Sequence, residues 1–351
     1  TEIIQQHTGT VVACAISDFT IAVFEWKNSR LVRLGTLKGH RDRVNDIKFL
    51  SPKLIFSGSS DGTVMGWDLE NGGRVAFRFE LYEEVRCVAC SVLNGEPICV
   101  CGLEDGTVQI WSLKSKRMIS KFEDGHTEAV TRISFHPTLK NIFFTSSEDG
   151  LVCVFDLLKK SVDDALIGVA NTDSSVRRFG LFKSNLLWCL TDTESLALFR
   201  IDDDGCEELK SFDEIRQYDS TSGQCILSDY LVDCMFDDRT TSLLILAGDH
   251  TGQLKLLKLC DERVLPIFTF PSRCGHTSTV RCVANLGNDM IVTGGDDGLL
   301  CVWPRSSSSP SSLSRSSGKD TSNISSSSSS GVGKVHRKPG RGSGFARARP
   351  Y

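Results

Sequence analysis

The chain has 351 residues, 40% of them hydrophobic, and a formal net charge of −4. This composition is typical of a globular domain, and no apolar run reaches the roughly 18 residues of a transmembrane helix. The charge is divided unevenly: residues 306–351 contain eight Lys or Arg and one Asp, a net charge of +7, so residues 1–305 carry −11. The sequence therefore describes an acidic body with a basic C-terminal tail and no membrane segment.

The 14 cysteines are spread through apolar segments of the chain. No signal peptide opens the sequence, and its first residue is Thr, so we expect an N-terminus that has been processed or trimmed. Without a secretion signal, buried reduced thiols in an intracellular compartment are the better interpretation.

Residues 1–36 contain four candidate strands. They lie near Glu2–Gln6, Val11–Ile16, Thr20–Trp26 and Leu31–Thr36, and Asp18 lies in the turn between the second and third. Short apolar segments separated by turn residues are typical of a meander of antiparallel strands.

Residues 37–79 show the pattern most clearly, since they open with Gly39-His40 and reach Trp67-Asp68 after a Ser-Asp-Gly turn. Four residues of this unit stand where a polar clip could join its strands: His40, Ser57, Asp61 and Trp67. A buried imidazole needs a partner on each nitrogen, because an unpaired buried polar group costs about 1–3 kcal/mol.

The spacing recurs, with a hydroxyl four residues before the turn Asp and an aromatic residue six residues after it. The unit at 80–122 keeps Asp105 and Trp111 but has Leu81 and Cys101 at the other two positions. Two later units, near 123–170 and 271–303, carry the polar set: His126, Thr145 and Asp149 with Phe155 in place of Trp, and His276, Thr293, Asp297 and Trp303.

Two weaker units lie between these. Residues 171–212 have Cys189 and Thr193 at key positions. After a longer connection over 213–228, the next unit has Ser228, Ala247, Thr251 and Leu257 at the four clip positions, none of which matches. Seven units of about 43 residues account for residues 1–305, so the sequence predicts an all-β, seven-bladed β-propeller, followed by a disordered tail over 306–351.

These units resemble the WD40 repeat, and other stretches resemble one branch of the WD40 family: HPTLKNIFFTSSEDGLVCVFDL (136–157), DDAL (163–166), SSVRRFG (174–180), GHTSTVRCV and TGGDDGLLCVW. The resemblance implies that the Trp N–H, the Ser or Thr hydroxyl, His and Asp form one hydrogen-bonded chain in each complete blade. It also implies a scaffold without catalysis, and a role in ribosome assembly or another nuclear complex.

The last blade presents a problem of closure. Pro304 and a run of Ser follow Trp303, so we expect no fourth strand from that side. Either residues 1–7 complete the blade, or the closing strand lies upstream of Thr1. We favour the second alternative. An unclosed ring would expose strand edges that invite pairing.

The tail divides into two parts. Residues 306–330 are mostly Ser and cannot form a core. Six basic residues follow without an acid, and they are candidates for nucleic-acid binding or nuclear import: Lys334, Arg337, Lys338, Arg341, Arg347 and Arg349. The alternative is a solubilising tail without a partner.

Two motifs resemble a hydrolase active site and a zinc site, but the strands in which they lie argue against both functions. Gly58-Ser59-Ser60-Asp61-Gly62 matches a hydrolase elbow, but it lies between two short strands and not between a strand and a helix. Cys87 and Cys90 are three residues apart on one strand, so they point to opposite faces and suit core packing better than zinc. We expect no metal, no cofactor and no catalytic residues.

Arginines recur after the first apolar residue of the innermost strand in three units. They are Arg86, Arg177 and Arg281, and Arg41 and Arg43 lie in the matching loop of the second unit. These five residues predict a basic rim around one mouth of the central channel, suited to an acidic peptide or phosphate. The alternative is that each Arg pairs with a carboxylate of a neighbouring blade.

The sequence therefore predicts a non-catalytic scaffold that binds protein partners, and RNA or ribosomal particles through its tail. We expect a monomeric propeller within a larger complex, in the nucleus, including the nucleolus, and in the cytoplasm. The specific hypothesis is an assembly factor in ribosome biogenesis. The alternative is a substrate receptor of a cullin-4 ubiquitin ligase, although the adaptor-binding Trp-Asp-x-Arg pattern is missing at Trp67-Asp68-Leu69-Glu70.

Overall fold

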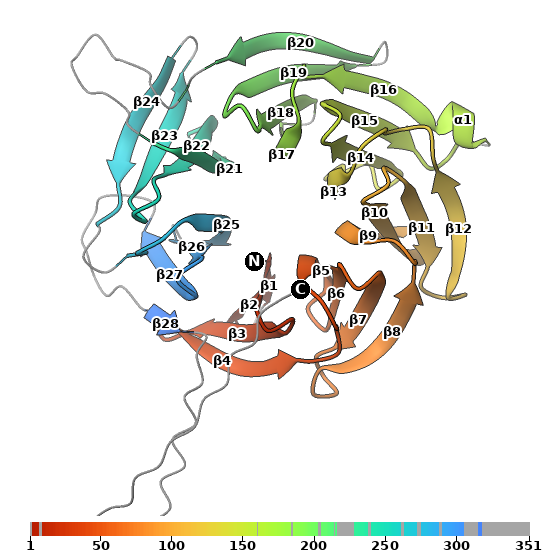
Figure 1. Cartoon of the computed structure of the whole chain (residues 1–351), viewed down its shortest axis with the longest axis horizontal. Coiled ribbons are helices and arrows are strands. Elements are labelled where there is room, and N and C mark those ends of the chain that lie inside the picture. Colours follow the sequence, from red (N-terminus) through yellow and green to blue (C-terminus); the bar gives the residue numbers. More distant parts are fainter. Residues whose placement is uncertain are drawn as a thin grey trace, which may run out of the picture. The chain divides into compact units, whose positions relative to one another are not determined.

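The computed structural model describes residues 2–6, 9–159, 161–183, 185–202, 205–213, 215, 228–237, 240–260, 263–271, 275–287, 290–304 and 315–317. Their strands form seven four-stranded antiparallel sheets. The sheets are arranged as blades around a central opening, with the first strand of each blade innermost (Figure 1). The predicted all-β, seven-bladed propeller is confirmed.

Each blade uses four consecutive strands. Blade 1 contains β1 Glu2–Gln6, β2 Gly9–Ala15, β3 Ile21–Lys27 and β4 Arg30–Leu37, and blade 2 contains β5 Val44–Ser51, β6 Leu54–Ser59, β7 Thr63–Asp68 and β8 Arg74–Glu80. Blade 3 contains β9 Val85–Leu93, β10 Glu96–Leu103, β11 Val108–Ser112 and β12 Arg117–Phe122. Blade 4 contains β13 Val130–Phe135, β14 Ile142–Ser147, β15 Leu151–Asp156 and β16 Leu166–Asn171. Blade 5 contains β17 Val176–Phe182, β18 Leu186–Thr191, β19 Leu196–Asp202 and β20 Gly205–Phe212. Blade 6 contains β21 Tyr230–Asp237, β22 Ser242–Gly248, β23 Leu254–Cys260 and β24 Arg263–Thr269. Blade 7 contains β25 Val280–Gly287, β26 Met290–Gly295, β27 Leu299–Pro304 and β28 Arg315–Ser317. The short helix α1, Val162–Ala165, precedes β16, and among the described residues no helix is long and apolar enough to cross a membrane.

The turn between the second and third strands of a blade follows from two residue types. In blade 2 the Asp61 carboxylate accepts the backbone N–H of Thr63 at 3.0 Å. Gly62 takes a φ of +74°, a conformation that costs little without a Cβ. The Asp-Gly pair therefore reverses the chain in two residues, which is why it marks the units in the sequence.

The core lies between blades. Seven clusters of buried apolar side chains each join two neighbouring blades, and the seventh packs Val12 and Phe24 of blade 1 against Val292 and Val302 of blade 7. Because the apolar side chains of each sheet are covered by the next sheet, the ring is closed by side-chain packing.

Blade 7 corrects our expectation of its closure. Its fourth strand is β28, which pairs with β27 through Leu299 with Ser317 and Cys301 with Arg315. The prediction that no fourth strand follows Trp303 is therefore wrong, and β28 occupies the edge for which we preferred a strand upstream of Thr1. The free edge of β27 offers backbone groups that any sequence can pair, so a Ser-rich segment suffices.

The compact unit of the propeller extends from Thr1 to Gly318, and a second unit comprises Lys319–Tyr351. The predicted boundary at residue 305 precedes β28, which belongs to the first unit. Apart from β28, the predicted disorder of 306–351 concerns residues outside those that the structure describes.

Close packing between blades predicts a position that tolerates no side chain. A Cβ on Gly58 would lie 2.6 Å from Cγ1 of Val85 in the next blade, whereas a Cβ on Gly35 would meet nothing within 4 Å. We expect Gly58→Ala to lower the free energy of unfolding by about 1–3 kcal/mol through overpacking. The control Gly35→Ala should change it by less than about 1 kcal/mol. Urea denaturation of both variants measures this, and equal effects would contradict the inter-blade packing.

Candidate functional site

The complete polar clip of blade 2 is a continuous hydrogen-bonded chain. Trp67 Nε1 donates to Ser57 Oγ at 2.8 Å, and His40 lies between Ser57 and Asp61, with Nε2 2.7 Å from Ser57 Oγ and Nδ1 3.1 Å from Asp61 Oδ2. Asp61 also accepts the backbone N–H of Arg41 at 2.8 Å. The clip therefore ties the turn, the loop before β5 and the strands β6 and β7 together.

Blades 4 and 7 contain the same arrangement. His126 lies 2.7 Å from Thr145 Oγ1 and 3.1 Å from Asp149 Oδ2. The corresponding contacts of His276 are 2.8 Å to Thr293 and 3.1 Å to Asp297, and Trp303 Nε1 donates to Thr293 at 2.7 Å. Phe155 has no N–H to donate, so the chain in blade 4 ends at Thr145.

The clip favours a neutral imidazole and an ionised carboxylate. Burial lowers the pKa of His40, against the opposing effect of the Asp61 charge. Burial alone would raise the pKa of Asp61, but hydrogen bonds from Thr63, from the Arg41 backbone and from His40 lower it. The clip is thus saturated by its own members and has no group poised for proton transfer.

The weaker blades contain substitutes that sequence reasoning missed. In blade 6 the carboxylate of Asp249 accepts the backbone N–H of Gln253 at 2.9 Å, which is the role of Asp61 in blade 2. In blade 5 the buried Glu194 accepts two hydrogen bonds from Arg177, at 2.9 and 3.1 Å, and one from the Leu231 N–H. Asp249 therefore replaces the turn Asp of blade 2, and Glu194 ties blade 5 to blade 6.

A β-bulge recurs near the start of the innermost strand in blades 2 to 7. In each case the pairing register skips one residue: Asn45, Arg86, Thr131, Arg177, Val232 and Arg281. A bulge re-aims the side chain of its extra residue. The recurring Val-Arg pairs of the sequence mark this bulge.

Several bulge residues reach the neighbouring blade. Asn45 Nδ2 donates to the carbonyl of Val85 at 2.8 Å, and Thr131 Oγ1 donates to that of Val176 at 2.5 Å. Arg177 Nη2 donates to the carbonyl of Leu231 at 2.6 Å. Each acceptor lies at or next to the start of the following innermost strand, so the bulges connect successive blades around the channel.

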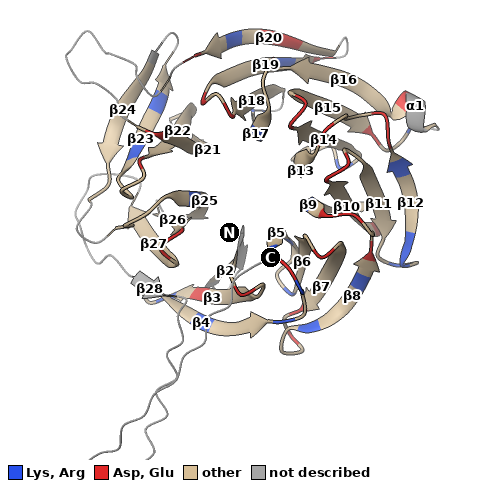
Figure 2. Ribbon diagram, viewed as in Figure 1, with Lys and Arg blue, Asp and Glu red and all other residues tan. Residues whose placement is uncertain are grey.

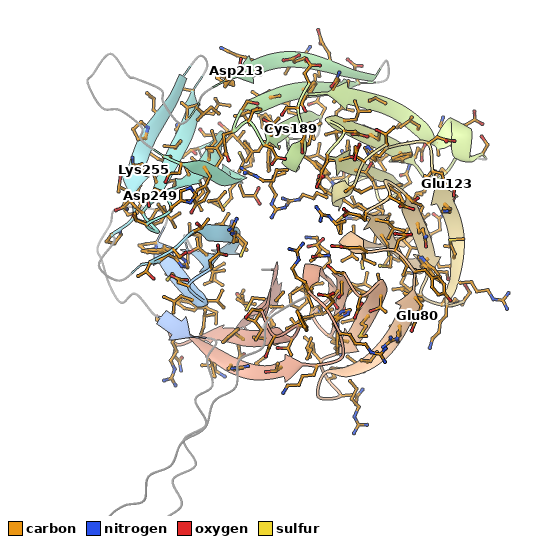
Figure 3. All side chains as sticks on the ribbon, viewed as in Figure 1. Glu80, Glu123, Cys189, Asp213, Asp249 and Lys255 are labelled. Carbon is orange, nitrogen blue, oxygen red and sulfur yellow. The ribbon has the colours of Figure 1, made fainter. Side chains whose placement is uncertain are left out.

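The channel contains a cavity of about 1010 Å³, and its described lining comes from blades 2 to 7. Four of the five predicted rim residues line it: Arg43, Arg86, Arg177 and Arg281; Arg41 does not. Figure 3 shows nitrogen-tipped side chains projecting into this opening. Figure 2 shows Lys and Arg also on outer strands such as β8, β12 and β20, with Asp and Glu in turns nearer the opening.

Carboxylates surround most of these guanidiniums. Arg86 lies 2.8 Å from Glu148 of blade 4 and 3.2 Å from Glu104. Arg281 donates to Asp296 at 2.7 and 3.0 Å, and Arg177 pairs with Glu194. Arg43 donates to Asn45 at 2.8 Å. The geometry thus pairs Arg86, Arg177 and Arg281 with acids, and it fixes their positions at the mouth.

The motifs that resembled chemistry lie in the core. Ser59 is buried and donates to the carbonyl of Asp42 at 3.1 Å. Cys87 packs between blades 3 and 4, and Cys90 packs between blades 2 and 3, on opposite faces of the strand. Within the described part of the chain, no group of His, Cys, Asp and Glu could hold a metal ion. The six basic tail residues lie outside that part.

Comparisons with known proteins agree with the repeat pattern. The family model "WD domain, G-beta repeat" matches residues 31–68, 117–156 and 266–304. The chain is 30% identical over 307 residues to the WD repeat-containing protein 89 homolog of Dictyostelium discoideum, covering 84% of this chain and 80% of that protein. It is 27% identical to WD repeat-containing protein GTS1 of Arabidopsis thaliana, covering 86% of this chain and 80% of that one.

The fold has a counterpart among solved structures. The computationally designed Ika8 protein matches with a TM-score of 0.59 and 21% identity, over 87% of this chain and 83% of that one. This likeness concerns the fold alone.

The Arg177–Glu194 pair predicts a strong dependence of stability on one carboxylate. Glu194 is 7% exposed and bonds to a neighbouring blade, whereas the side chain of Asp296, the partner of Arg281, is 43% exposed. We expect Glu194→Gln to lower the free energy of unfolding by about 3 kcal/mol, and Asp296→Asn by less than about 1 kcal/mol. Urea denaturation compares the two, and a cost for Glu194→Gln no larger than for Asp296→Asn would show that the pair is dispensable.

The lowered pKa of His40 predicts how stability changes with pH. Since the unfolded state binds the proton more readily, the contribution of His40 is complete above its ordinary pKa of 6.5 and is lost as the pH falls below it. Wild type should therefore lose more stability than His40→Asn between pH 7.5 and the acid end of this titration. Parallel curves of unfolding free energy against pH would be the contrary result.

Proposed function

The chain belongs to the WD40-repeat family, in the branch of WD repeat-containing protein 89, and from this premise we propose that it is a non-catalytic scaffold for protein assembly in ribosome biogenesis. Membership of the family implies a propeller that binds proteins. The proposal adds the process in which it does so, ribosome biogenesis.

The observation that supports binding at the channel mouth is the convergence of fixed polar side chains on one open cavity. Arg86, Arg177 and Arg281 come from three different blades, and each is held by carboxylates. A group that is already oriented loses little conformational freedom when a partner arrives. This supports a preorganised docking surface at the mouth.

The charge division supports ribosome biogenesis. An acidic propeller suits partners with basic surfaces, and the basic tail suits RNA, because phosphate contacts by Lys and Arg release counterions. We propose that the propeller binds proteins while the six tail cations contact RNA, in the nucleus, including the nucleolus, and in the cytoplasm.

The ligase-receptor alternative gains no support at the adaptor-binding position. Glu70 stands where that pattern has Arg, and its carboxylate pairs with Lys53 at 2.6 Å. In blade 4 the corresponding residue is Leu158, which is 59% exposed. A receptor role would need a different contact with the adaptor.

The test is affinity purification from cell extract, with and without ribonuclease. The bait is either the full-length protein or a full-length variant in which all six tail cations are Gln: Lys334, Arg337, Lys338, Arg341, Arg347 and Arg349. We expect wild type to recover preribosomal proteins, with a loss of at least about tenfold after ribonuclease or tail neutralisation, because the RNA link is electrostatic.

The matched control changes six exposed cations of the outer strands and turns to Gln: Arg30, Arg74, Lys114, Lys116, Arg117 and Lys140. It should recover the same proteins as wild type. Recovery of the cullin-4 adaptor under all conditions, without ribosomal proteins, would overturn the proposal in favour of the ligase receptor.

A further inference from the structure

A second set of charged residues lies one position beyond the bulge, inside the channel. Arg132 of β13, Arg178 of β17 and Asp233 of β21 occupy this position in blades 4, 5 and 6. Asp46 of β5 occupies it in blade 2, with Lys48 two residues further along the strand. All five line the cavity.

The two carboxylates of this set also serve the backbone. Asp233 accepts the N–H of Cys234 at 2.8 Å and the guanidinium of Arg132 at 3.2 Å. Asp46 accepts the N–H of Ile47 at 2.9 Å and of Val88 at 3.1 Å, and Lys48 lies 3.6 Å from it. Part of their acceptor capacity is therefore used by the strands themselves.

Arg178 has the largest unused donor capacity. Its guanidinium lies 4.0 Å from Asp233, beyond hydrogen-bonding distance. Among the described residues its hydrogen bond is the one from Nη1 to the carbonyl of Arg177, at 3.3 Å. Arg has five N–H donors, and the Arg178 side chain is 34% exposed. Burial and the nearby charge of Arg132 lower its pKa, against the opposing charges of Asp233 and Asp46.

The charges of the set select the ligand. The described lining of the cavity contains seven Lys or Arg and five Asp or Glu, an excess of two positive charges, and Asp233 is the carboxylate nearest to Arg178 and Arg132. The excess attracts an anion, and the carboxylates of Asp233 and Asp46 repel a phosphate dianion more strongly than a single carboxylate, which carries half its charge. Arg also binds carboxylates through two parallel hydrogen bonds.

We propose that Arg178, with Arg132 beside it, binds the carboxylate of an Asp or Glu side chain that a partner protein inserts into the channel. This inference rests on the proposed scaffold function and names the chemistry of the segment that the channel takes. The carboxylate would accept hydrogen bonds from the N–H groups of Arg178 that its own chain leaves unused.

The probe is a phage library of random heptapeptides selected on the immobilised full-length protein. We expect selected peptides to contain an Asp or Glu whose replacement by Asn or Gln weakens binding at least about tenfold, since a hydrogen bond between charged groups is lost. Arg178→Gln should weaken binding of the acidic peptides to a similar extent, and Arg178→Lys should retain part of it.

Arg200→Gln is the matched control, because it removes a cation from the same blade that Glu207 already pairs and that does not line the cavity. It should leave peptide affinity unchanged, and thermal unfolding should confirm that all variants fold. The basic tail is present in every variant, so tail binding cannot mimic dependence on Arg178. Selection without acidic residues, equal affinity for Arg178→Gln, or displacement of the peptides by inorganic phosphate at constant ionic strength would each overturn the inference. If one of these contrary results were obtained while preribosomal proteins were still recovered, the scaffold function would stand without a carboxylate site at Arg178.

Discussion

The structure depends on the packing of each blade against the next. A four-stranded sheet cannot bury its apolar side chains by itself, and each of the seven clusters is built from two adjacent sheets. The ring must therefore close for every face to be covered, and Val12 and Val302 belong to the cluster that closes it. Hydrogen bonds from Asn45, Thr131 and Arg177 to the next blade add direction to this non-directional packing.

This dependence explains why complete clips are needed only in some blades. A clip orders the turn and the loop within one blade, whereas the apolar clusters hold neighbouring blades together. Blade 3 has Cys101 at the hydroxyl position, and that side chain lies in the cluster shared with blade 2. Blade 5 compensates by the charged pair of Arg177 and Glu194, because both members bond to Leu231 of blade 6. Loss of a clip is tolerated where a neighbour supplies the constraint.

The repeat and its clips could be predicted because they are local: His40, Ser57, Asp61 and Trp67 lie within one unit at fixed spacing. The bond from the Leu231 N–H to Glu194 could not be predicted, since only the fold brings the turn of blade 5 against the start of β21. Asp249 was missed because the acid stands two residues before the expected position, Thr251, although Gly248 and Leu254 pair across the turn as Gly58 and Val64 do. The strand β28 escaped notice because its pairing depends on the free edge of β27 and on backbone groups, to which residue type contributes little.

The channel shows why a count of cations does not locate a binding site. Arg86 is surrounded by Glu84, Glu104 and Glu148, so its charge is neutralised within the protein and it acts as a structural link between blades. Arg178 follows a less regular pattern in the sequence, yet it has more N–H donors than the hydrogen bonds that it makes within the described part of the chain. The capacity of an Arg to bind a partner depends on how many hydrogen bonds it can donate beyond those that its own chain accepts. That number is smaller for Arg177 and Arg281, which donate to carboxylates of their own blades, than for Arg178, whose described hydrogen bond goes to one backbone carbonyl.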